Sequence, residues 1–280
     1  MPEFHQHWLF HQLKQGLTRQ NLDKAVKDLR AGLESDGLWG TMGWQDIRNR
    51  YRRSNIGPFW LTISMGIMVG ALGLLYGTIF GQPMEDYLPY LAAGLLIWGL
   101  LSSLILEGGR AFIAAEGLIK QLPAPLSIHV YRVAWSNLVI FMHNFVIYFA
   151  VAFWFEKYPH WPVLMVIPAL ALLLLNGVWI GLLLGLLSAR FRDIPQISAS
   201  IVQVMFFITP IMWKPEMLPD RALILELNPF YYLIEIVRAP LMSSWPSIKV
   251  VFGCLVITGI GWALALIFYT AYRWRLAYWV

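Results

Sequence analysis

Residues 45–60 read QDIRNRYRRSNIGPFW, and in this stretch a cluster of arginines meets a long apolar segment. Four arginines fall within six residues, and the last of them is Arg53. Gly57 and Pro58 then break any helix, and apolar sequence begins at Phe59. A basic cluster of this kind can bind nucleic acid, anionic lipid or a partner protein, and the rest of the chain must decide between them.

The composition is that of a membrane protein. Of the 280 residues, 58% are hydrophobic and 13% are charged, and the mean hydropathy is +0.59. Soluble domains carry about 25% charged residues. A chain this short cannot bury so much apolar surface within itself, so lipid must cover part of it. The net charge of +5 is then mainly a signal of membrane topology, and we expect no nucleic-acid partner.

The sequence predicts an all-α fold with six membrane-spanning helices. A span needs about 20 mostly apolar residues. The candidate segments are 59–80, 89–106, 133–155, 162–187, 196–213 and 248–271. Most lysines and arginines between the spans fall on the side of the amino terminus, so the positive-inside rule places both termini in the cytoplasm. The first 36 residues lack the apolar stretch of a signal peptide, so we expect them to be retained.

Two further helices are expected before the first span. Residues 1–36 form an extension whose apolar residues repeat at helical spacing: Leu22, Val26, Leu29 and Leu33. We expect this helix to pack on its own protein or on the membrane surface. Residues 37–58 form a second amphipathic pattern, with one face made of Gly40, Trp44, Ile47 and Tyr51. Aromatic anchors with basic flanks are typical of a helix in the membrane interface.

Two segments between the spans are more than simple turns. Loop 107–132 lies on the cytoplasmic side, and its centre, FIAAEGLIKQL, predicts a short helix over 113–121 that ends before Pro123. This helix suits a partner contact, although it could be a plain connector. On the outer side, segment 214–247 holds two short helical patterns separated by Asn228-Pro229. Each is too short to span, so we expect them to dip into the outer leaflet or cap an exit, shielded by protein or lining an aqueous cavity.

The sequence contains no catalytic or cofactor-binding motif that we recognise. It has no phosphate-binding loop of the type G-x-x-x-x-G-K-[ST] and no clustered metal ligands. Ionisable residues are almost absent from the middle of the spans, which argues against an ion-coupled carrier and favours a separate ATPase. Glu107 at the end of the second span is expected to pair, in a structural role, with an interface arginine such as Arg48 or Arg53.

A few polar and aromatic residues lie within or near the predicted spans. Asn144 and Asn176 either serve function or only hydrogen-bond a neighbouring helix. Aromatic side chains can stack on sugars, so some of them are candidates for lining a sugar path. Their alternative role is to pack within the protein or to form an aromatic belt at the membrane interface. The candidates for lining a channel are Trp98, Trp135, His143 and Tyr148.

Four stretches together resemble the permease subunits of type-2 ABC exporters for polysaccharides, which include O-antigen, capsule and teichoic-acid exporters. WQDIRNRYRRSNIGPFW (44–60) resembles the segment before the first span of that family. EGLIKQLPAPLSIHVYR (116–132) resembles its coupling segment, ARFRDIPQI (189–197) its loop between spans four and five, and NPFYYLIEIVRAPL (228–241) the segment after span five. The four occur in family order and cover about 45–245.

The resemblance implies a homodimer of six-span subunits, with a membrane domain over 59–280, in the bacterial inner membrane. Two ATPase subunits would bind ATP and Mg beneath it, and this chain itself would bind no cofactor. A lipid-linked polysaccharide would pass between the two permeases. The implied ATPase-coupling residues are Glu116, Leu118, Ile119 and Lys120. The implied gate residues are Asn228, Pro229, Tyr231, Tyr232 and Arg238.

The same resemblance makes residues 37–58 an interface helix. Its implied contacts are with lipid headgroups, the substrate's pyrophosphate or the ATPase, through Arg48, Arg50, Tyr51, Arg52, Arg53 and Trp60. The extension 1–36 is longer than the family pattern, and its role is open. The alternative functions are those of a permease for a small amphiphile or drug and of a membrane-embedded glycosyl- or acyltransferase. The acidic residues on the outer side are scattered, which disfavours the transferase.

Overall fold

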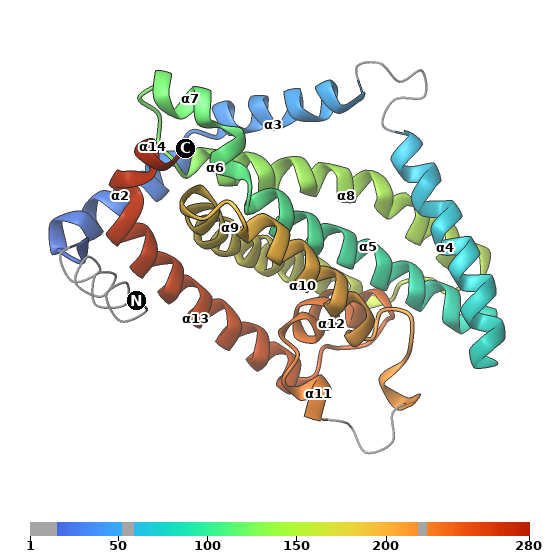
Figure 1. Ribbon diagram of the computed structural model, residues 1–280. Helices are drawn as coiled ribbons and strands as arrows, with labels where there is room; N and C mark the ends of the chain where they lie inside the picture. Colours follow the sequence, from blue (N-terminus) through green and yellow to red (C-terminus); the bar gives the residue numbers. More distant parts are fainter. Residues whose placement is uncertain (1–15, 52–58, 218–222) are drawn as a thin grey trace.

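The computed structural model describes residues 16–51, 59–217 and 223–280, and all the regular elements in these ranges are helices. The long helices form one bundle, and shorter helices gather at its two ends (Figure 1). Arg52, Arg53 and the Gly57-Pro58 turn lie outside the described residues. The all-α prediction is confirmed for the part of the chain that the structure describes.

Five helices among the described residues are long and apolar enough to cross a membrane, so the chain is a multi-pass membrane protein. They are α4 (Phe59–Phe80), α5 (Met84–Gly108), α8 (Ile128–Trp154), α9 (Val166–Arg190) and α13 (Ile248–Tyr272). A short 3-10 turn, η1 (Trp161–Met165), leads into α9. Five of the six predicted spans therefore correspond to observed helices.

The sixth predicted span, 196–213, is not a helix of spanning length. Helix α10 covers only Ile194–Ile208, which is about 22 Å long against a hydrocarbon core of about 30 Å. The helix ends because Thr209 precedes Pro210, which lacks an N–H and disfavours helical backbone in the residue before it. Thr209 is accordingly extended, and 209–213 continue as buried, non-helical chain in which Thr209 and Ile211 are fully buried.

Helix α5 is the centre of the bundle. Nearly all of its residues from Tyr87 to Leu101 are buried, and it packs against α4, α8, α9, α10 and α12. Helices α4 and α13 lie at opposite edges of the bundle (Figure 1). Both carry exposed apolar side chains, including Ile63, Ile67 and Leu74 on α4 and Phe252, Ile260 and Leu264 on α13. A bilayer would cover such surfaces.

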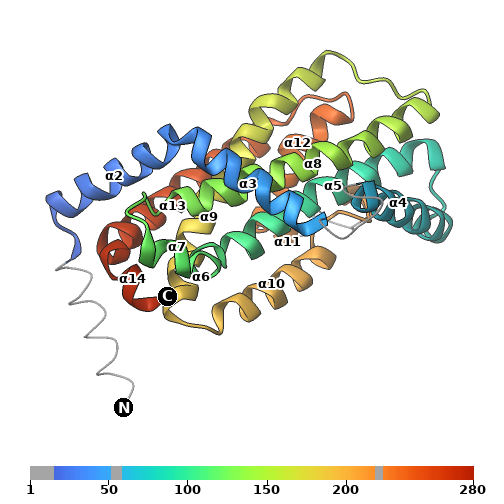
Figure 2. The ribbon, with the colours of Figure 1, turned by 90° about the horizontal axis from the view of Figure 1, so that it is seen from above.

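The short helices lie at the two ends of the bundle, the α7 end and the α12 end. The α7 end carries α2 (Arg19–Glu34), α6 (Ala111–Ala114), α7 (Glu116–Gln121), η3 (Arg273–Arg275) and α14 (Leu276–Trp279). The α12 end carries η2 (Pro215–Met217), α11 (Leu223–Glu226) and α12 (Pro229–Leu241). Helix α3 (Asp36–Tyr51) continues from α2 and lies along α8 (Figure 2).

Both helices before the first span form, but their packing faces differ from their most apolar faces. Helix α2 packs on α13 and α8 through its small and polar residues Ala25, Asp28 and Gly32, whereas the apolar Leu22, Val26 and Leu33 are exposed. In α3 the predicted face is only partly correct. Ile47 is buried, but Trp44 is 50% exposed. Gly43 completes the buried face because it lies against Arg132 and Trp135 of α8.

Helices α5 and α9 cross closely at two glycines, because a Cβ added at Gly108 would lie 3.0 Å from Gly181 Cα. A Cβ added at Gly181 would lie 2.7 Å from Val130 Cγ1 and 3.4 Å from Gly108 Cα. Small residues of this kind let membrane helices approach closely enough for backbone contact.

We therefore expect Gly181→Ala to destabilise the protein by about 1–3 kcal/mol, because the added methyl would overlap with the side chain of Val130 on α8. The matched control is Gly259→Ala in α13, where an added Cβ meets nothing within 4 Å. Thermal unfolding of the purified protein in detergent measures both. An unfolding midpoint for Gly181→Ala at or above that of Gly259→Ala would contradict the close packing at Gly181.

Candidate functional site: the two ends of the bundle

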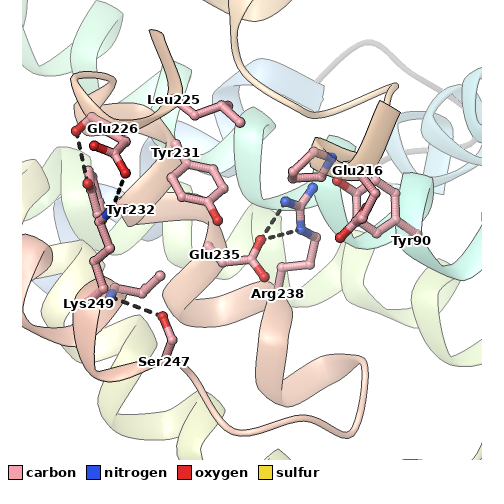
Figure 3. A pocket seen from close by; sticks show the side chains of 12 residues that line it. Tyr90, Glu216, Leu225, Glu226, Tyr231, Tyr232, Glu235, Arg238, Ser247 and Lys249 are labelled. Atoms are coloured by element: carbon pink, nitrogen blue, oxygen red, sulfur yellow. Dashed lines mark hydrogen bonds and ion pairs between the residues drawn. The ribbon is translucent and has the colours of Figure 1, made fainter. Parts of the chain in front are cut away.

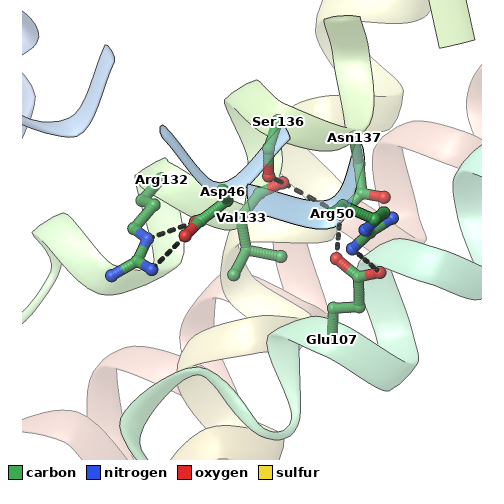
Figure 4. A network of polar contacts seen from close by, with 7 residues as sticks. All are labelled: Asp46, Arg50, Glu107, Arg132, Val133, Ser136 and Asn137. Atoms are coloured by element: carbon green, nitrogen blue, oxygen red, sulfur yellow. Dashed lines mark hydrogen bonds and ion pairs between the residues drawn. The ribbon is translucent and has the colours of Figure 1, made fainter. Parts of the chain in front are cut away.

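Two ion pairs hold α3 onto the long helices (Figure 4). Arg50 Nη2 lies 2.9 Å from Glu107 Oε1 on α5, and the second oxygen of Glu107 accepts a hydrogen bond from Asn137 Nδ2 of α8 at 2.9 Å. One turn earlier on α3, the Asp46 carboxylate pairs with Arg132 of α8 through both of its oxygens. Helix α3 is thereby tied to both α5 and α8.

The expected pairing of Glu107 with an arginine of the interface helix is confirmed, although neither of the two arginines named as examples is the partner. Its partner is Arg50, whereas Arg48 is exposed and Arg53 lies outside the described residues. Arg50 is four residues after Asp46, so both side chains project from one face of α3. Both members of the Arg50–Glu107 pair are more than a third exposed, so its net stabilisation is at most about 1 kcal/mol. Its contribution is to the orientation of α3 more than to stability.

The other members of the predicted interface group are less constrained. Arg48 is exposed on α3, and Trp60 is 53% exposed in the first turn of α4. Tyr51 is the last residue of α3, and Arg52 belongs to the segment that is not described. Of the arginines in the described part of this cluster, Arg50 thus has a defined protein partner and Arg48 faces outward.

The predicted helix 113–121 is divided into α6 and α7 at Ala115. No residue of α7 is buried, and Glu116 accepts a hydrogen bond from Lys120 at 2.7 Å. That bond lowers the pKa of Glu116 below its usual value, so the carboxylate is charged at neutral pH. Leu118 and Ile119 are half-buried, and Ile119 packs against the core. The helix ends at Gln121, before the predicted proline break.

At the α12 end, the predicted break at Asn228-Pro229 separates α11 from α12. Asn228 caps α12, because its side-chain oxygen accepts from the N–H of Phe230 at 2.9 Å. Its amide nitrogen donates to Thr209 Oγ1 at 2.9 Å. Pro229 occupies the first turn of α12, where its missing N–H costs nothing. The cap therefore joins α12 to the chain that follows α10.

Arg238 is the central residue of the α12 end (Figure 3). Its side chain is 1% exposed, pairs with Glu235 one turn earlier on α12, and donates to the carbonyl oxygen of Pro210. The guanidinium also lies 4.1 Å from the centre of the Tyr90 ring on α5. A buried charge of this kind is stable only when it is paired and hydrogen-bonded. Arg238 meets both conditions and so connects α12, α5 and segment 209–213.

A cavity of about 850 Å³ opens beside Arg238 (Figure 3). Its lining combines aromatic rings with charged side chains: Tyr90, Tyr231, Tyr232, Glu216, Glu226, Glu235, Arg238 and Lys249. Tyr231, Tyr232 and Arg238 were predicted from the sequence as gate residues. Tyr90 and Glu235 were not predicted as site residues. The spacing of Glu235 and Arg238 on one helical turn is the signal that could have identified the ion pair.

The four channel candidates have different environments. Trp98 is 8% exposed and lies between Phe206 and Phe230, with ring centres 5.6 Å apart in each case. Tyr148 is 1% exposed and donates its hydroxyl to the carbonyl oxygen of Leu241. Trp135 and His143 are exposed on α8. Trp98 and Tyr148 thus pack within a single chain, whereas Trp135 and His143 reach its surface.

The two asparagines within the spans, Asn144 and Asn176, both form hydrogen bonds with side chains of a neighbouring helix, and Asn176 also bonds within its own helix. Asn176 is fully buried, donates to Thr258 Oγ1 of α13 at 2.8 Å, and accepts from Trp179 Nε1 at 2.8 Å. Asn144 lies 3.3 Å from the hydroxyl of Thr62 on α4. Interhelical hydrogen bonds of this kind join membrane helices.

Residues 37–242, from α3 to the end of α12, match the family model described as ABC-2 type transporter. The chain belongs to the ABC-2 type transporter family. This confirms the family resemblance that the four sequence stretches indicated. Membership of this family assigns the chain a role in transport, as a permease. Permeases of this family work in general with an ABC ATPase.

Two relatives show which ABC-2 transporters are similar to this chain. The O-antigen export system permease protein RfbA of Myxococcus xanthus is 22% identical over 206 residues, which is 72% of this chain and 79% of the relative. The protein of the same name from Klebsiella pneumoniae is 23% identical over 221 residues, which is 77% of this chain and 83% of the relative.

We expect Arg238→Gln to destabilise the ABC-2 transporter by about 3 kcal/mol, because it leaves the carboxylate of Glu235 without its ion-pair partner. It also removes the guanidinium donor to the Pro210 carbonyl, which then keeps only the hydroxyl of Tyr90. The matched control is Lys157→Gln, which removes the exposed pair with Asp86 on the same end of the bundle. Unfolding of both purified variants in detergent provides the comparison. Equal unfolding midpoints for Arg238→Gln and Lys157→Gln would contradict the central role of Arg238 at the α12 end.

Proposed function

We propose that this ABC-2 transporter forms the membrane channel of an ATP-driven exporter that moves a lipid-linked polysaccharide of the O-antigen type. The observation that carries the proposal is α7: an exposed, ion-paired helix at one end of a bundle whose opposite end holds an aromatic and charged cavity. The names of the similar permeases support the choice of polysaccharide.

A separate ATPase supplies the energy in this proposal. The middle of the described spans offers little with which a proton or sodium gradient could be coupled, since its principal ionisable group is His143. Helix α7 is the contact for the ATPase, through Glu116, Leu118, Ile119 and Lys120. The exposed Arg48 adds a positive charge on α3. Two ATPase subunits bind ATP and Mg²⁺, and this chain performs no chemistry of its own.

The proposed topology follows from the charge distribution. The α7 end faces the cytoplasm together with both termini, and the α12 end faces the periplasm, in the bacterial inner membrane. Helix α10 and the buried chain 209–213 together cross the membrane as a sixth span. Backbone that is not helical is acceptable at this depth because protein shields it and bonds its carbonyls. Asn228, Pro229, Tyr231, Tyr232 and Arg238 then belong to a periplasmic gate.

We expect the charge exchange Glu116→Lys with Lys120→Glu to abolish ATP-driven export. The exchange keeps an ion pair within α7, at a cost of a few tenths of a kcal/mol, but reverses the charges that a partner would meet. Co-purification with the ATPase and export in cells are the two measurements. The matched control is the same exchange on exposed α2, Arg30→Glu with Glu34→Arg. Normal export by the α7 variant would contradict the proposed contact.

The proposed channel lies between two copies of the chain. Helix α4 packs on α5 and α8 along one side, and its other side is apolar and exposed. Helix α10 likewise exposes a row of apolar side chains: Ile197, Ile201, Val204 and Phe207. Lipid can cover these rows, and so can the second subunit of a twofold-symmetric dimer. We assign them to the dimer contact, with Trp135 and His143 as the remaining surface candidates for the channel.

Cysteines at Ile67 and Ile201, in a Cys254→Ser background, are expected to link two copies through a short bifunctional maleimide in native membranes. The matched control replaces Ile201→Cys by Ile260→Cys on α13, which is similarly exposed but lies at the edge away from α4. Covalent dimers are measured on denaturing gels. Equal yields from the two pairs would contradict a dimer formed by α4 and α10.

The substrate class is tested by deleting the chromosomal copy. A polysaccharide on a lipid carrier is expected to accumulate inside the cells and to disappear when the wild-type gene is restored. Isolation of the lipid-linked fraction and sugar analysis identify the material. Accumulation of a small amphiphile instead, with normal surface polysaccharide, would overturn the proposal.

A further inference from the structure

The amino-terminal helix α2 carries a buried carboxylate that none of the functional assignments above uses. The Asp28 side chain is 3% exposed, although α2 is otherwise a charged helix with an exposed face. The helix lies at the α7 end, in contact with α8 and α13. It also lies outside residues 37–242, the part that matches the ABC-2 family, so the family pattern does not account for it.

The Asp28 carboxylate accepts hydrogen bonds from two separate parts of the chain. The backbone N–H groups of Leu126 and Ser127, just before α8, each donate at 3.1 Å. The Tyr269 hydroxyl, near the end of α13, donates at 2.6 Å, and Arg273 Nε, at the start of η3, donates at 3.2 Å. One side chain on α2 therefore holds the start of α8 and the end of α13 together.

The backbone of α2 adds to the same junction. The Ser127 hydroxyl donates to the carbonyl oxygen of Asp28 at 2.9 Å, and the Tyr131 hydroxyl donates to that of Leu29 at 3.1 Å. Gly32 permits this approach, because a Cβ there would lie 2.1 Å from Ser127 Oγ. The carboxylate of Asp28 accepts four hydrogen bonds in all, and a buried carboxylate is tolerated only when it is bonded in this way.

The junction lies on the chain path from α7 into the membrane. Helix α7 ends at Gln121, four residues with two prolines follow, and Leu126 and Ser127 are the next residues. The prolines restrict the backbone of this link. On the other side of the junction, η3 and α14 follow α13, and α14 contacts α7. A force on α7 thus reaches two membrane helices, and Asp28 connects both of them.

We propose that Asp28 is a positioning residue that makes the segment after α7 and the end of α13 move as one rigid unit. Helix α2 acts as a permanent latch that stays closed throughout the transport cycle. Without the latch, movement of α7 bends the link 122–127 and is lost before it reaches the long helices. This inference rests on the proposed role of α7 as the ATPase contact.

The first experiment measures coupling and not only activity. The complete complex of permease and ATPase is reconstituted, and polymer exported per ATP hydrolysed is determined for Asp28→Asn. The amide keeps the size of the side chain but cannot accept at one of its two positions. The expected result is continued ATP hydrolysis with about a tenfold fall in polymer per ATP, the factor typical for loss of a charge-assisted hydrogen bond.

The matched control is Asp23→Asn, which makes the same change of charge on the exposed face of α2. A merely structural role for Asp28 would lower the amount of assembled complex and both activities in proportion, leaving the ratio unchanged. An unchanged ratio in Asp28→Asn would therefore overturn the proposal. If the wild-type complex itself shows no ATP-driven export, the proposed function fails, and this is seen before any variant is compared.

The second experiment tests whether the latch stays closed and does not depend on how well Asp28→Asn folds. Gly32→Cys and Ser127→Cys are combined with Cys254→Ser. The Cβ positions at 32 and 127 are 3.2 Å apart, a few tenths of an ångström under the usual disulfide range. We expect the disulfide to form in membranes and export to continue after oxidation. Failure of the bond to form, or loss of export that a reductant restores, would overturn a permanently closed latch.

Discussion

In a bilayer no water is available to bond exposed backbone groups, and the structure depends on how it meets this constraint where a helix is broken. Helix α10 ends at Ile208, two residues before Pro210, and the buried chain after it has carbonyl groups without helical partners. Three side chains supply the donors: Tyr87 to Met212, Tyr90 to Pro210 and Trp213, and Arg238 to Pro210. Because these donors come from α5 and α12, the chain that follows the break in α10 is bonded to both helices.

At the α7 end the backbone groups that need partners are donors, and a buried negative charge accepts from them. There the unpaired backbone groups are the N–H groups before α8, and the buried carboxylate of Asp28 accepts from them. Each end of the bundle is thus organised by one buried ion that also pairs with an oppositely charged side chain, Glu235 for Arg238 and Arg273 for Asp28. The exposed α7 and the cavity beside Arg238 are attached to these two rigid frames.

Several features could be predicted from local sequence because local chemistry determines them. The five long helices follow from apolar length, the end of α7 from the prolines that follow, and the break before α12 from Asn228-Pro229. Other features could not. The partner of Glu107 depended on how α3 is rotated over α8, which placed Arg50 there instead of Arg48. The face of α2 that packs is its small and polar one, because backbone approach and hydrogen bonds outweighed the apolar stripe.

The sequence alone determined that this is an all-helical membrane protein, and its motifs indicated the transporter family, because apolar length and short motifs are properties of contiguous residues. The tertiary structure decided which polar groups meet. Asp28 and Tyr269 are 241 residues apart, and Tyr90 and Arg238 come from different helices. Such pairs have no local signal, since each side chain would be an ordinary surface residue on an isolated helix. Only the packing of the bundle removes water from them and makes their partners necessary.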